Sequence, residues 1–480
     1  MDFAGYKYIA TLLVFAEIAI VLLYYRRDPK LAFYAILVSI ALKGQYLWVG
    51  RPVYAWQIAG LLGLVFMFGK SSVATSLRPG RTLSAVNVSF QLYCIYALAV
   101  SVPMWILFSA EGLGTDTTAV SSTRIVTQVV YFSFIVGLYG FGRYAGRYVT
   151  TFDLLRTLVI IATVAGVFAL VQVAVFSRTG LNLFPIIGSD DTIRSAFINN
   201  LTFRATSFAG EPKHLGILMS VGLTSFFLAR LFRIRIGGRF ALLMPLAMIG
   251  AVLFSLSTTG VALTAAGIGI SSLLFFRRFR FIDVAVVGIV LFAVLGWYST
   301  AESSFQTAME KQLTKENLEP QDDSVRLALL ANPEFILTGT GLGNIHLIAV
   351  DYLPANFPLF RDAGYKSNSG FLFVLGDAGL IGLSLLAAML AFGLQGYLKE
   401  RKLYSSDARR EASVSLALLF LTFLSLMLRY DVFFFLFSGF VYTRLSILRT
   451  RAIEAQGEGK RPLSLRATGY HRQPFEKPLL

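Results

Sequence analysis

Long apolar segments recur along the whole of this 480-residue chain, and they constrain its fold more than any other feature. A helix needs roughly 20 mostly apolar residues to cross the hydrocarbon core of a bilayer. Reading the sequence with a window of that length predicts about 13 membrane spans. Because several spans are joined by very short turns, a count of about 12 or about 14 is also possible. The predicted spans are residues 6–25, 31–49, 53–69, 85–109, 124–142, 154–176, 215–232, 240–256, 260–276, 282–298, 370–394, 413–428 and 432–448.

The composition agrees with a membrane protein. Hydrophobic residues make up 56% of the chain and charged residues 15%, whereas soluble domains are about 45–50% apolar and about 25% charged. We therefore expect an all-α, polytopic integral membrane protein, and the composition excludes disordered, collagen-like and disulfide-scaffold proteins. The one cysteine, Cys94, has no second cysteine with which to form a disulfide within the chain.

The basic residues predict the orientation of the chain in the membrane. The formal net charge is +16, and Lys and Arg gather in every second loop between the predicted spans. Because cytoplasmic loops carry an excess of Lys and Arg, this charge indicates a cytoplasmic membrane face rather than a nucleic-acid partner. The C-terminus is then cytoplasmic, and an odd number of spans puts the N-terminus outside. The basic groups are Arg26, Arg27 and Lys30; Arg78 and Arg81; Arg143 and Arg147; Arg233, Arg235 and Arg239; Arg277, Arg278 and Arg280; Lys399, Arg401 and Lys402; and Arg449 and Arg451.

Two of the loops predicted to lie outside are too long to be simple connections. The second of them is net acidic, unlike the cytoplasmic loops. Because long loops in compact domains are usually functional, we expect the chemistry of the protein in these two segments. The chain then divides into N-terminal spans (1–176), a first long loop (177–214), central spans (215–298), a second long loop (299–369), C-terminal spans (370–448) and a basic tail (449–480) that either binds anionic lipid or is simply solvated.

The first long loop ends in a group of polar residues that runs directly into a predicted span. Pro212 suits the first turn of a helix, and a carboxylate just before it complements the positive helix N-terminus. Glu211 is therefore either a helix cap or a general base, and His214 is either a hydrogen-bonded residue at the membrane interface or the second candidate for the base. Arg204 and Lys213 add two cations at the same boundary.

The second long loop offers two further cations and a glycine-rich run. Arg326 and Arg361 are either partners in surface ion pairs or ligands of an anion, since acidic residues surround both. Gly341 and Gly343 belong to the run Gly339-Thr-Gly-Leu-Gly343, which predicts a tight turn with positive φ rather than a nucleotide motif.

Polar residues also interrupt two of the apolar stretches. Ser257 and Thr258 lie at a predicted helix hairpin, where small hydroxyl residues pack closely or satisfy freed backbone groups. Arg429-Tyr430-Asp431 separates the last two predicted spans. It is either a simple turn or a line of charge that faces a cavity.

Four of these segments together resemble the O-antigen polymerase and ligase superfamily, over roughly residues 200–385. The resemblance implies a GT-C-like helical body in the bacterial inner membrane that joins glycans on the periplasmic face. The implied donor is a polyprenyl-diphosphate-linked glycan, transferred with inversion and with neither metal nor cofactor. The implied partners are membrane lipid, a flippase and a chain-length regulator. The four segments are Arg204 with Phe208-x-x-Glu211-Pro212; Ser257-Thr258-Thr259-Gly260; Arg326 followed by Gly339-Thr-Gly-Leu-Gly343; and the run from Asn368 to Gly382.

Within that superfamily the sequence looks more like a polymerase than a ligase. Ligases typically carry a His just before the Asn of the last motif, and Ser367 stands there in this chain. We therefore expect an O-antigen or exopolysaccharide polymerase. The alternatives are an O-antigen ligase, a cell-wall glycan polymerase of the shape, elongation and division type, and a lipid-linked-oligosaccharide flippase or transporter.

The chemistry implied by the resemblance assigns a role to each candidate residue. Without a metal, stabilisation of a departing diphosphate requires Arg and Lys, and the attacking hydroxyl needs a base. We expect a polyprenyl chain to lie in an apolar groove open to lipid. The expected base is Glu211 or His214; the expected diphosphate ligands are Arg204, Lys213, Arg326 and Arg361; and the expected supporting residues are Ser257, Thr258, Gly341, Gly343 and Asn368.

Overall fold

A computed structural model of the chain describes most of the predicted spans. The predicted span 282–298, the candidates Arg361 and Asn368, and residues 460–480 of the tail lie outside the described residues. The described residues are 4–24, 27–41, 46–48, 52–69, 80–111, 122–180, 197–198, 202–236, 238, 241–275, 320–353, 369–429, 431 and 433–459.

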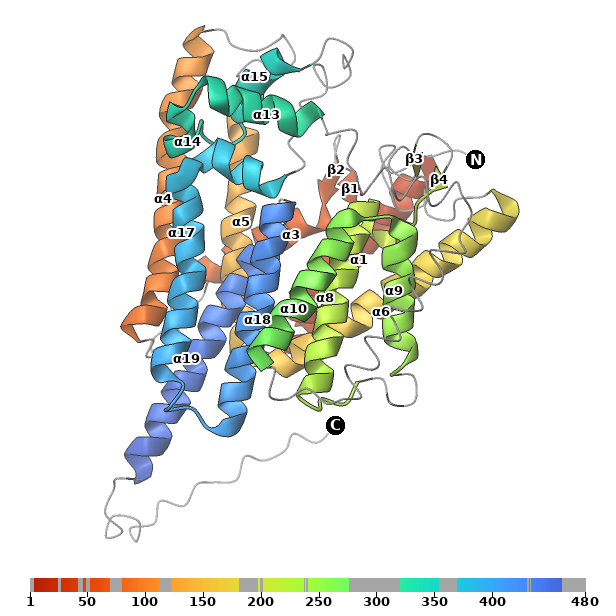
Figure 1. Ribbon diagram of the computed structural model, residues 1–480, viewed down its shortest axis with the longest axis vertical. Coiled ribbons are helices and arrows are strands. Elements are labelled where there is room, and N and C mark those ends of the chain that lie inside the picture. The colour runs from red at the N-terminus through yellow and green to blue at the C-terminus, as the bar shows by residue number, and fades with distance from the viewer. Residues whose placement is uncertain are drawn as a thin grey trace.

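Helices dominate the described chain (Figure 1). Every predicted span that lies among the described residues overlaps a helix. The helices are α1 (Ala4–Tyr24), α2 (Pro29–Ala41), α3 (Ala55–Gly69), α4 (Arg81–Glu111), α5 (Ser122–Tyr148), α6 (Thr151–Thr179), α8 (Pro212–Leu231), α9 (Leu243–Ser255), α10 (Thr258–Phe275), α13 (Pro320–Ala331), α14 (Glu334–Thr338), α15 (Ile345–Ala349), α17 (Gly370–Glu400), α18 (Ser406–Leu428) and α19 (Phe433–Gly459), with short 3-10 turns η2 (Ser207–Ala209) and η5 (Val350–Tyr352).

Five of the described helices are long and apolar enough to cross a membrane: α4, α6, α8, α17 and α18. The expectation of a helical membrane protein is confirmed at this level. The predicted number of spans stays a prediction, because several other apolar helices are shorter, among them α9 and the apolar part of α10.

Two short antiparallel hairpins depart from the all-helical expectation. In the first, β1 (Tyr46–Trp48) pairs with β2 (Pro52–Tyr54), so α2 ends well before the predicted limit of its span. Lys43, Gly44 and the Gly50-Arg51-Pro52 run interrupt the apolar sequence here, and Gly and Pro are the poorest helix formers. The second hairpin pairs β3 (Phe197–Ile198) with β4 (Thr202–Phe203), just before the candidate site.

The long helices begin and end where local side chains satisfy free backbone groups. Thr150 caps α6 by accepting a hydrogen bond from the Asp153 N–H at 3.1 Å. At the other end Gly180, with φ +67°, closes the helix through a 2.8 Å bond from its N–H to the Phe176 carbonyl. Helix ends carry such unpaired groups by construction, so these caps define the limits of α6.

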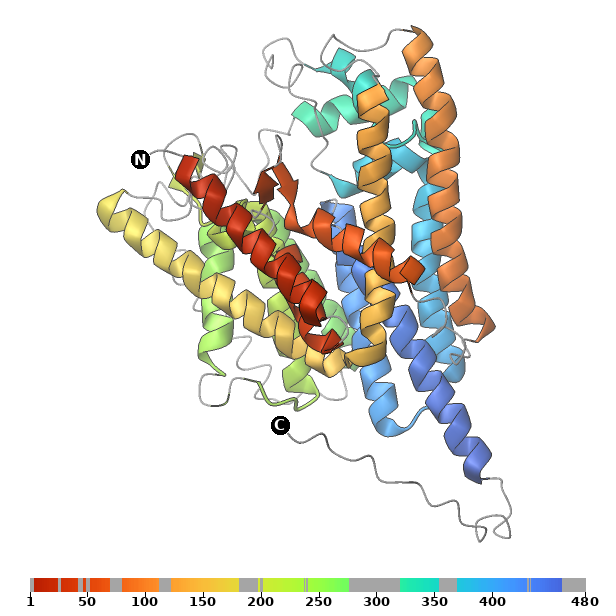
Figure 2. The same cartoon turned by 180° about the vertical axis from the view of Figure 1, so that it is seen from behind.

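The helices form two groups joined by α18 (Figures 1 and 2). In one group α4 packs on α17, and α5 packs on α3 and α19. In the other, α8 packs on α6, α9 and α10. Helix α18 contacts α17 and α19 on one side and α8 and α10 on the other, so residues at its two ends can bridge the groups.

Small residues and aromatic rings set the packing of α5 against its neighbours. Gly137 on α5 lies directly against the backbone of Gly60 on α3, where any added Cβ would clash with the Gly60 carbonyl. Close approach at small residues is the usual way in which membrane helices associate. Between α5 and the neighbouring helices lie buried rings, and Phe33 stacks on Phe440 at 6.0 Å between ring centroids.

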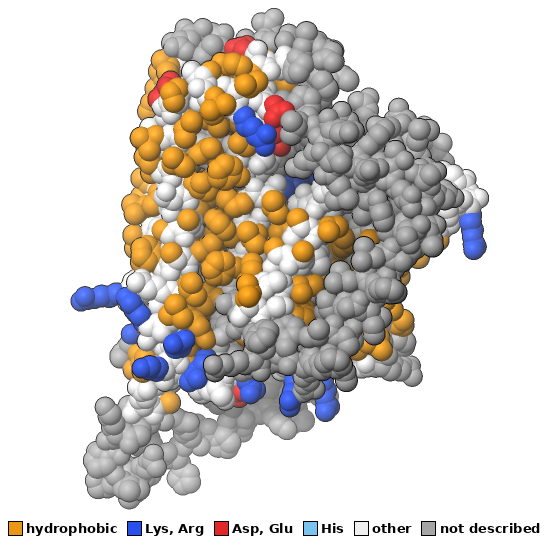
Figure 3. Space-filling view, in the orientation of Figure 1, with side chains coloured by type: hydrophobic (Ala, Val, Ile, Leu, Met, Phe, Trp, Pro, Cys, Tyr) orange, Lys and Arg blue, Asp and Glu red, His pale blue; other side chains and the backbone are white. Residues whose placement is uncertain are grey.

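The helix bundle has an upper and a lower end. The upper end is where α13, α14 and α15 lie and where α8, α10 and α17 begin; the lower end is where α4 and α18 begin (Figure 1). Basic side chains lie along the lower end in the face drawn in Figure 3. The predicted basic loops among the described residues therefore share one end of the molecule, and the side of the membrane that this end faces stays a prediction.

Candidate functional site

Glu211 stands at the upper end, immediately before α8. Its backbone is extended (φ −128°, ψ 144°), and Pro212 occupies the first turn of the helix, as the sequence predicts. Within the described part of the chain, however, the Glu211 side chain accepts no capping hydrogen bond from α8. The absence of a capping bond to α8 among the described residues disfavours a role of the carboxylate as cap alone.

The Glu211 carboxylate instead meets two side chains that can carry positive charge. The Nη2 atom of Arg429 donates a hydrogen bond of 2.5 Å to Glu211 Oε2. The Nε2 atom of His214 lies 3.6 Å from the same oxygen, which is close but beyond hydrogen-bond distance. Arg429 is 15% exposed, His214 18% and Glu211 40%, so the group lies half-buried at the boundary of the bundle.

Arg429 reaches this position because α18 ends beside it. Its own backbone is extended (φ −150°), and its N–H donates to the Ser425 carbonyl at 2.9 Å. Two residues on, the buried Asp431 accepts 3.3 Å hydrogen bonds from the Phe433 N–H and from the Ser425 hydroxyl. The sequence left open whether this segment is a simple turn or a line of charge that faces a cavity; the described residues show Arg429 paired with Glu211 and Asp431 buried against the end of α18.

Arg204 lies at the same end but is engaged with the backbone of α9. Its Nε donates to the Ser255 carbonyl at 3.0 Å and its Nη2 to the Leu256 carbonyl at 3.4 Å. Leu256, with φ +48°, ends α9, and the last carbonyls of a helix lack partners within it. The buried Arg204 thus caps α9 and ties the segment before α8 to the α9–α10 turn.

A glutamine that the sequence analysis did not single out holds the same segment against α6. The Oε1 atom of Gln172 accepts 3.0 Å hydrogen bonds from the N–H groups of Thr206 and Ser207, and its Nε2 donates to the Thr206 hydroxyl. Gln172 is fully buried. A polar residue inside an apolar span was the only signal in the sequence that could have pointed to it.

Ser257 and Thr258 lie where α10 packs on α8. The Ser257 hydroxyl accepts a 3.1 Å hydrogen bond from the Gly260 N–H, so it caps α10. An added Cβ on Gly216 of α8 would lie 2.5 Å from the Ser257 Oγ. Thr258 is the first residue of α10. This geometry supports the packing interpretation of the pair, and Lys213 lies half-buried on the first turn of the neighbouring α8.

Arg326 lies on α13 and points away from the apolar core below it. Its Nη1 donates to Asp323 Oδ1 at 3.1 Å, and its side chain is 53% exposed. Helix α13 itself is anchored, because Asp322 Oδ1 accepts a 3.2 Å bond from the Ser369 N–H just before α17. Arg326 therefore lies at the upper end in the surface ion pair that the sequence offered as one of two interpretations.

The glycine-rich run forms the predicted tight turn, with φ of +85° at Gly341 and +69° at Gly343. The turn docks on a break in α17, where Gly379 (φ 62°, ψ −169°) is non-helical. The Gly341 N–H donates to the Asp377 carbonyl at 2.9 Å, and the Gly343 N–H donates to Asp377 Oδ1 at 3.0 Å. The two glycines thus support the upper end by fixing the loop on α17.

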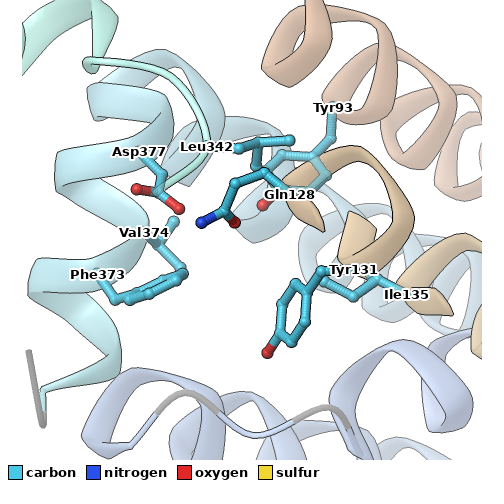
Figure 4. Close-up of a pocket in the computed structure, with 8 residues that line it drawn as sticks. All are labelled: Tyr93, Gln128, Tyr131, Ile135, Leu342, Phe373, Val374 and Asp377. Atoms are coloured by element: carbon cyan, nitrogen blue, oxygen red, sulfur yellow. The ribbon is translucent and has the colours of Figure 1, made fainter. Parts of the chain in front are cut away.

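A small pocket lies beneath this turn, between α4, α5 and α17 (Figure 4). The buried Asp377, Gln128 and the hydroxyl-bearing Tyr93 and Tyr131 line it. Its volume of about 10 Å³ is room for about one water molecule and not for a sugar. The sequence analysis assigned no role to Asp377, although an ionisable residue inside an apolar run is a signal in its own right.

A larger apolar groove runs between α4 and α17 on the outer surface. Its volume is about 670 Å³, and Figure 3 shows this flank of the bundle covered by hydrophobic side chains. Leu337 of α14, the helix at the upper end in Figure 1, is one of its lining residues. Its lining is mostly apolar, with Val88, Leu92, Leu380 and Phe392 among the lining residues.

At the upper end the structure thus brings Glu211 and His214 together with Arg429. Arg204 lies on the segment that leads into Glu211, whereas Arg326 lies on α13, which packs on α14, α15 and α17. A scan against models of known protein families gives no match to this chain, and a search of curated proteins also gives none. The chemistry of the site therefore follows from its own side chains.

Proposed function

We propose that this protein is a polysaccharide polymerase that joins polyprenyl-diphosphate-linked repeat units in the bacterial inner membrane. The observation that supports the proposal best is the contact of Glu211 with Arg429 and His214 at the upper end of a membrane bundle. A carboxylate and an imidazole supply a base, while a guanidinium supplies charge for a phosphate. These are the two requirements of glycosyl transfer from a diphosphate donor.

In the proposed reaction, a sugar hydroxyl attacks the anomeric carbon of the donor in one in-line displacement. The new C–O bond forms as the bond to the diphosphate oxygen breaks, and the diphosphate leaves with the electron pair. The hydroxyl proton passes to the Glu211–His214 pair. One displacement inverts the anomeric centre, and cations stabilise the negative charge that develops on the leaving group.

The remaining candidates take supporting roles in the proposal. Arg204, Lys213 and Arg326 are the proposed cations around the diphosphate, and Arg204 also holds α9 in place. The groove between α4 and α17 is the proposed seat of the polyprenyl chain. The upper end is proposed to face the periplasm, where a flippase delivers the substrate and a chain-length regulator acts on the product.

The test is an assay of the purified protein in detergent with a polyprenyl-diphosphate-linked repeat unit. The wild-type protein is expected to release polyprenyl diphosphate and to form a ladder of longer glycans. Glu211→Gln removes the carboxylate without changing its size, so it is expected to abolish both products. Glu334→Gln is the matched control, because Glu334 is an exposed carboxylate on α14 at the same end.

The same assay separates an enzyme from a transporter. A flippase moves the lipid-linked unit without breaking a bond, so it releases no polyprenyl diphosphate in detergent. Absence of release by the wild-type protein, or full-length glycan from Glu211→Gln, would contradict the proposal.

A further inference from the structure

Arg429 carries more hydrogen-bond donors than the described residues around it satisfy. A guanidinium has five N–H donors, and the Nη2 atom of Arg429 meets Glu211. The Nη1 atom is buried and has no hydrogen-bond acceptor in the part of the chain that the structure describes. A buried charged donor without an acceptor is costly, so the Nη1 side of Arg429 is suited to an acceptor from outside the described chain.

We propose that Arg429 binds the diphosphate of the lipid-linked substrate through its Nη1 side, while Nη2 stays on Glu211. This inference rests on the proposed function and deepens it, because it assigns the phosphate contact to one side of the Arg429 guanidinium and the hold on Glu211 to the other. Phosphate oxygens match the planar guanidinium fork and take charge-assisted hydrogen bonds from it. Glu211, the partner of Nη2, is 40% exposed and Arg429 is 15% exposed, so the pair lies at the edge of the packed bundle, where a small local movement brings a ligand to Nη1.

The surroundings of Arg429 favour an anion over a neutral ligand. The start of α8 lies beside Glu211, and a helix N-terminus contributes positive potential. Lys213 and His214 lie on that first helical turn. Only one anionic side chain, Glu211, contacts Arg429 among the described residues. The Arg429 guanidinium, the His214 imidazole and a helix N-terminus thus meet at one carboxylate, so the group offers a diphosphate more donors than acceptors.

Substitutions of the two members of this ion pair should affect ligand affinity in opposite ways. Arg429→Gln removes the charge that attracts the diphosphate and should weaken binding. Glu211→Gln leaves an amide oxygen for Nη2 but removes a negative charge that repels the ligand, so binding should stay as tight as in the wild type or become tighter. An ion pair that serves only the fold would instead give the same loss for both variants.

The experiment measures binding of farnesyl diphosphate to the full chain in nanodiscs of neutral phosphatidylcholine by calorimetry. For Arg429→Gln we expect a dissociation constant at least about tenfold above the wild type, as for the loss of a charge-assisted hydrogen bond. Arg429→Lys keeps the positive charge but lacks the planar guanidinium fork, so its dissociation constant is expected to lie between those of the wild type and Arg429→Gln. Arg410→Gln is the control, since Arg410 forms an exposed ion pair with Asp407 near the start of α18.

Competition then identifies the source of the phosphate. Displacement of farnesyl diphosphate by inorganic pyrophosphate, and not by farnesol, supports recognition of the diphosphate. Displacement by phosphatidylglycerol but not by pyrophosphate would assign the site to a lipid headgroup and overturn the inference. Thermal unfolding of each variant establishes that it is folded, and if Arg429→Gln is not folded, Arg429→Lys and Glu211→Gln decide the question.

The outcome is separable from that of the polymerase proposal, because binding needs no transfer. Equal affinity of the wild type and Arg429→Gln, in a protein that still forms polymer, would overturn the role of Arg429 alone. Diphosphate binding that depends on Arg429, in a protein that forms no polymer, would overturn the polymerase and leave the binding site.

Discussion

Helix α18 carries one half of an Arg–Glu ion pair near each of its ends, and the two pairs differ in how fully they are satisfied. Near the lower end, Arg444 of α19 donates from Nε at 2.9 Å and from Nη2 at 2.6 Å to Glu411 Oε1. The Thr151 N–H adds a 3.0 Å bond to the same oxygen. Arg444 is 4% exposed and Glu411 10%. At the upper end, Glu211 and Arg429 share one hydrogen bond, and more of the pair is exposed.

The difference separates a structural ion pair from a candidate site. The Glu411–Arg444 pair joins α18 and α19 to the start of α6, and the Arg444 Nη1 atom also donates to the Gly146 carbonyl at 3.4 Å. A buried pair with this many partners holds helices together and leaves little room for a ligand. The Glu211–Arg429 pair keeps an unsatisfied donor in the described chain and has a histidine beside it, which is the pattern expected where a substrate completes the contacts.

The strongest test of the contrast is Glu411→Ala. Removing one member of a buried ion pair leaves the other charge uncompensated, which typically costs about 3–5 kcal/mol. We expect a loss of that size in the free energy of unfolding, measured by denaturation in detergent. Asp407→Ala is the control on the same helix, because Asp407 is 81% exposed and its ion pair should contribute about 0–1 kcal/mol. If Glu411→Ala and Asp407→Ala lowered the free energy of unfolding equally, the Glu411–Arg444 pair could not be called a structural ion pair.

Arg429→Gln should have the opposite profile, with a large effect on rate and a small one on stability. Loss of a donor that stabilises the charge of a transition state typically lowers kcat by about 10²–10³-fold. We expect a fall of that order in the release of polyprenyl diphosphate. The free energy of unfolding should change by less than in Glu411→Ala, since the upper pair is less buried. A variant that is as active as the wild type would show the upper pair to be structural as well.

Gln172→Leu tests whether neutral hydrogen bonds hold the upper site in place. The substitution leaves the buried N–H groups of Thr206 and Ser207 without their acceptor, at an expected cost of about 1–3 kcal/mol. Because these residues precede Glu211, we expect a fall in both unfolding free energy and transfer rate. Gln172→Glu, which keeps the acceptor oxygen, should retain more of the transfer rate than Gln172→Leu, and a reversed order would contradict the assignment.

The smallest expected effect is that of Arg326→Ala on stability. Arg326 and Arg410 each form an exposed ion pair with an Asp three residues earlier, and such pairs contribute about 0–1 kcal/mol. Both alanine variants should therefore unfold like the wild type. Only Arg326→Ala should lower the transfer rate, because Arg326 lies at the end of the bundle that carries the site. An equal transfer rate in the two variants would remove Arg326 from the proposed diphosphate ligands.

Local features of the site could be predicted from the sequence. Pro212 begins α8, and the glycines of the Gly339–Gly343 run adopt the positive φ that their spacing predicts. These predictions succeed because proline, glycine and apolar periodicity act through the nearest few residues. The hairpin of β1 and β2 escaped prediction, since a window as long as a membrane span averages over the short polar break at Lys43 and Gly44.

The partners of the charged residues could not be predicted in this way. Arg204 was expected to face an anion, and its two hydrogen bonds to α9 depend on where the α9–α10 turn lies. In the sequence, Arg429 could be recognised only as an ionisable residue in an apolar stretch, and nothing there indicated its partner. Glu211 lies 218 residues before it in the chain.

The sequence by itself determined that the chain forms apolar helices separated by basic turns, because burial of hydrocarbon and placement of charge depend on composition within each segment. Only the tertiary structure decided which basic side chain pairs with which acidic side chain. Two Arg–Glu pairs of the same chemistry differ because α18 packs against α19 and α6 near one end and against the start of α8 near the other. That difference in neighbours leaves one pair closed and the other open to a ligand.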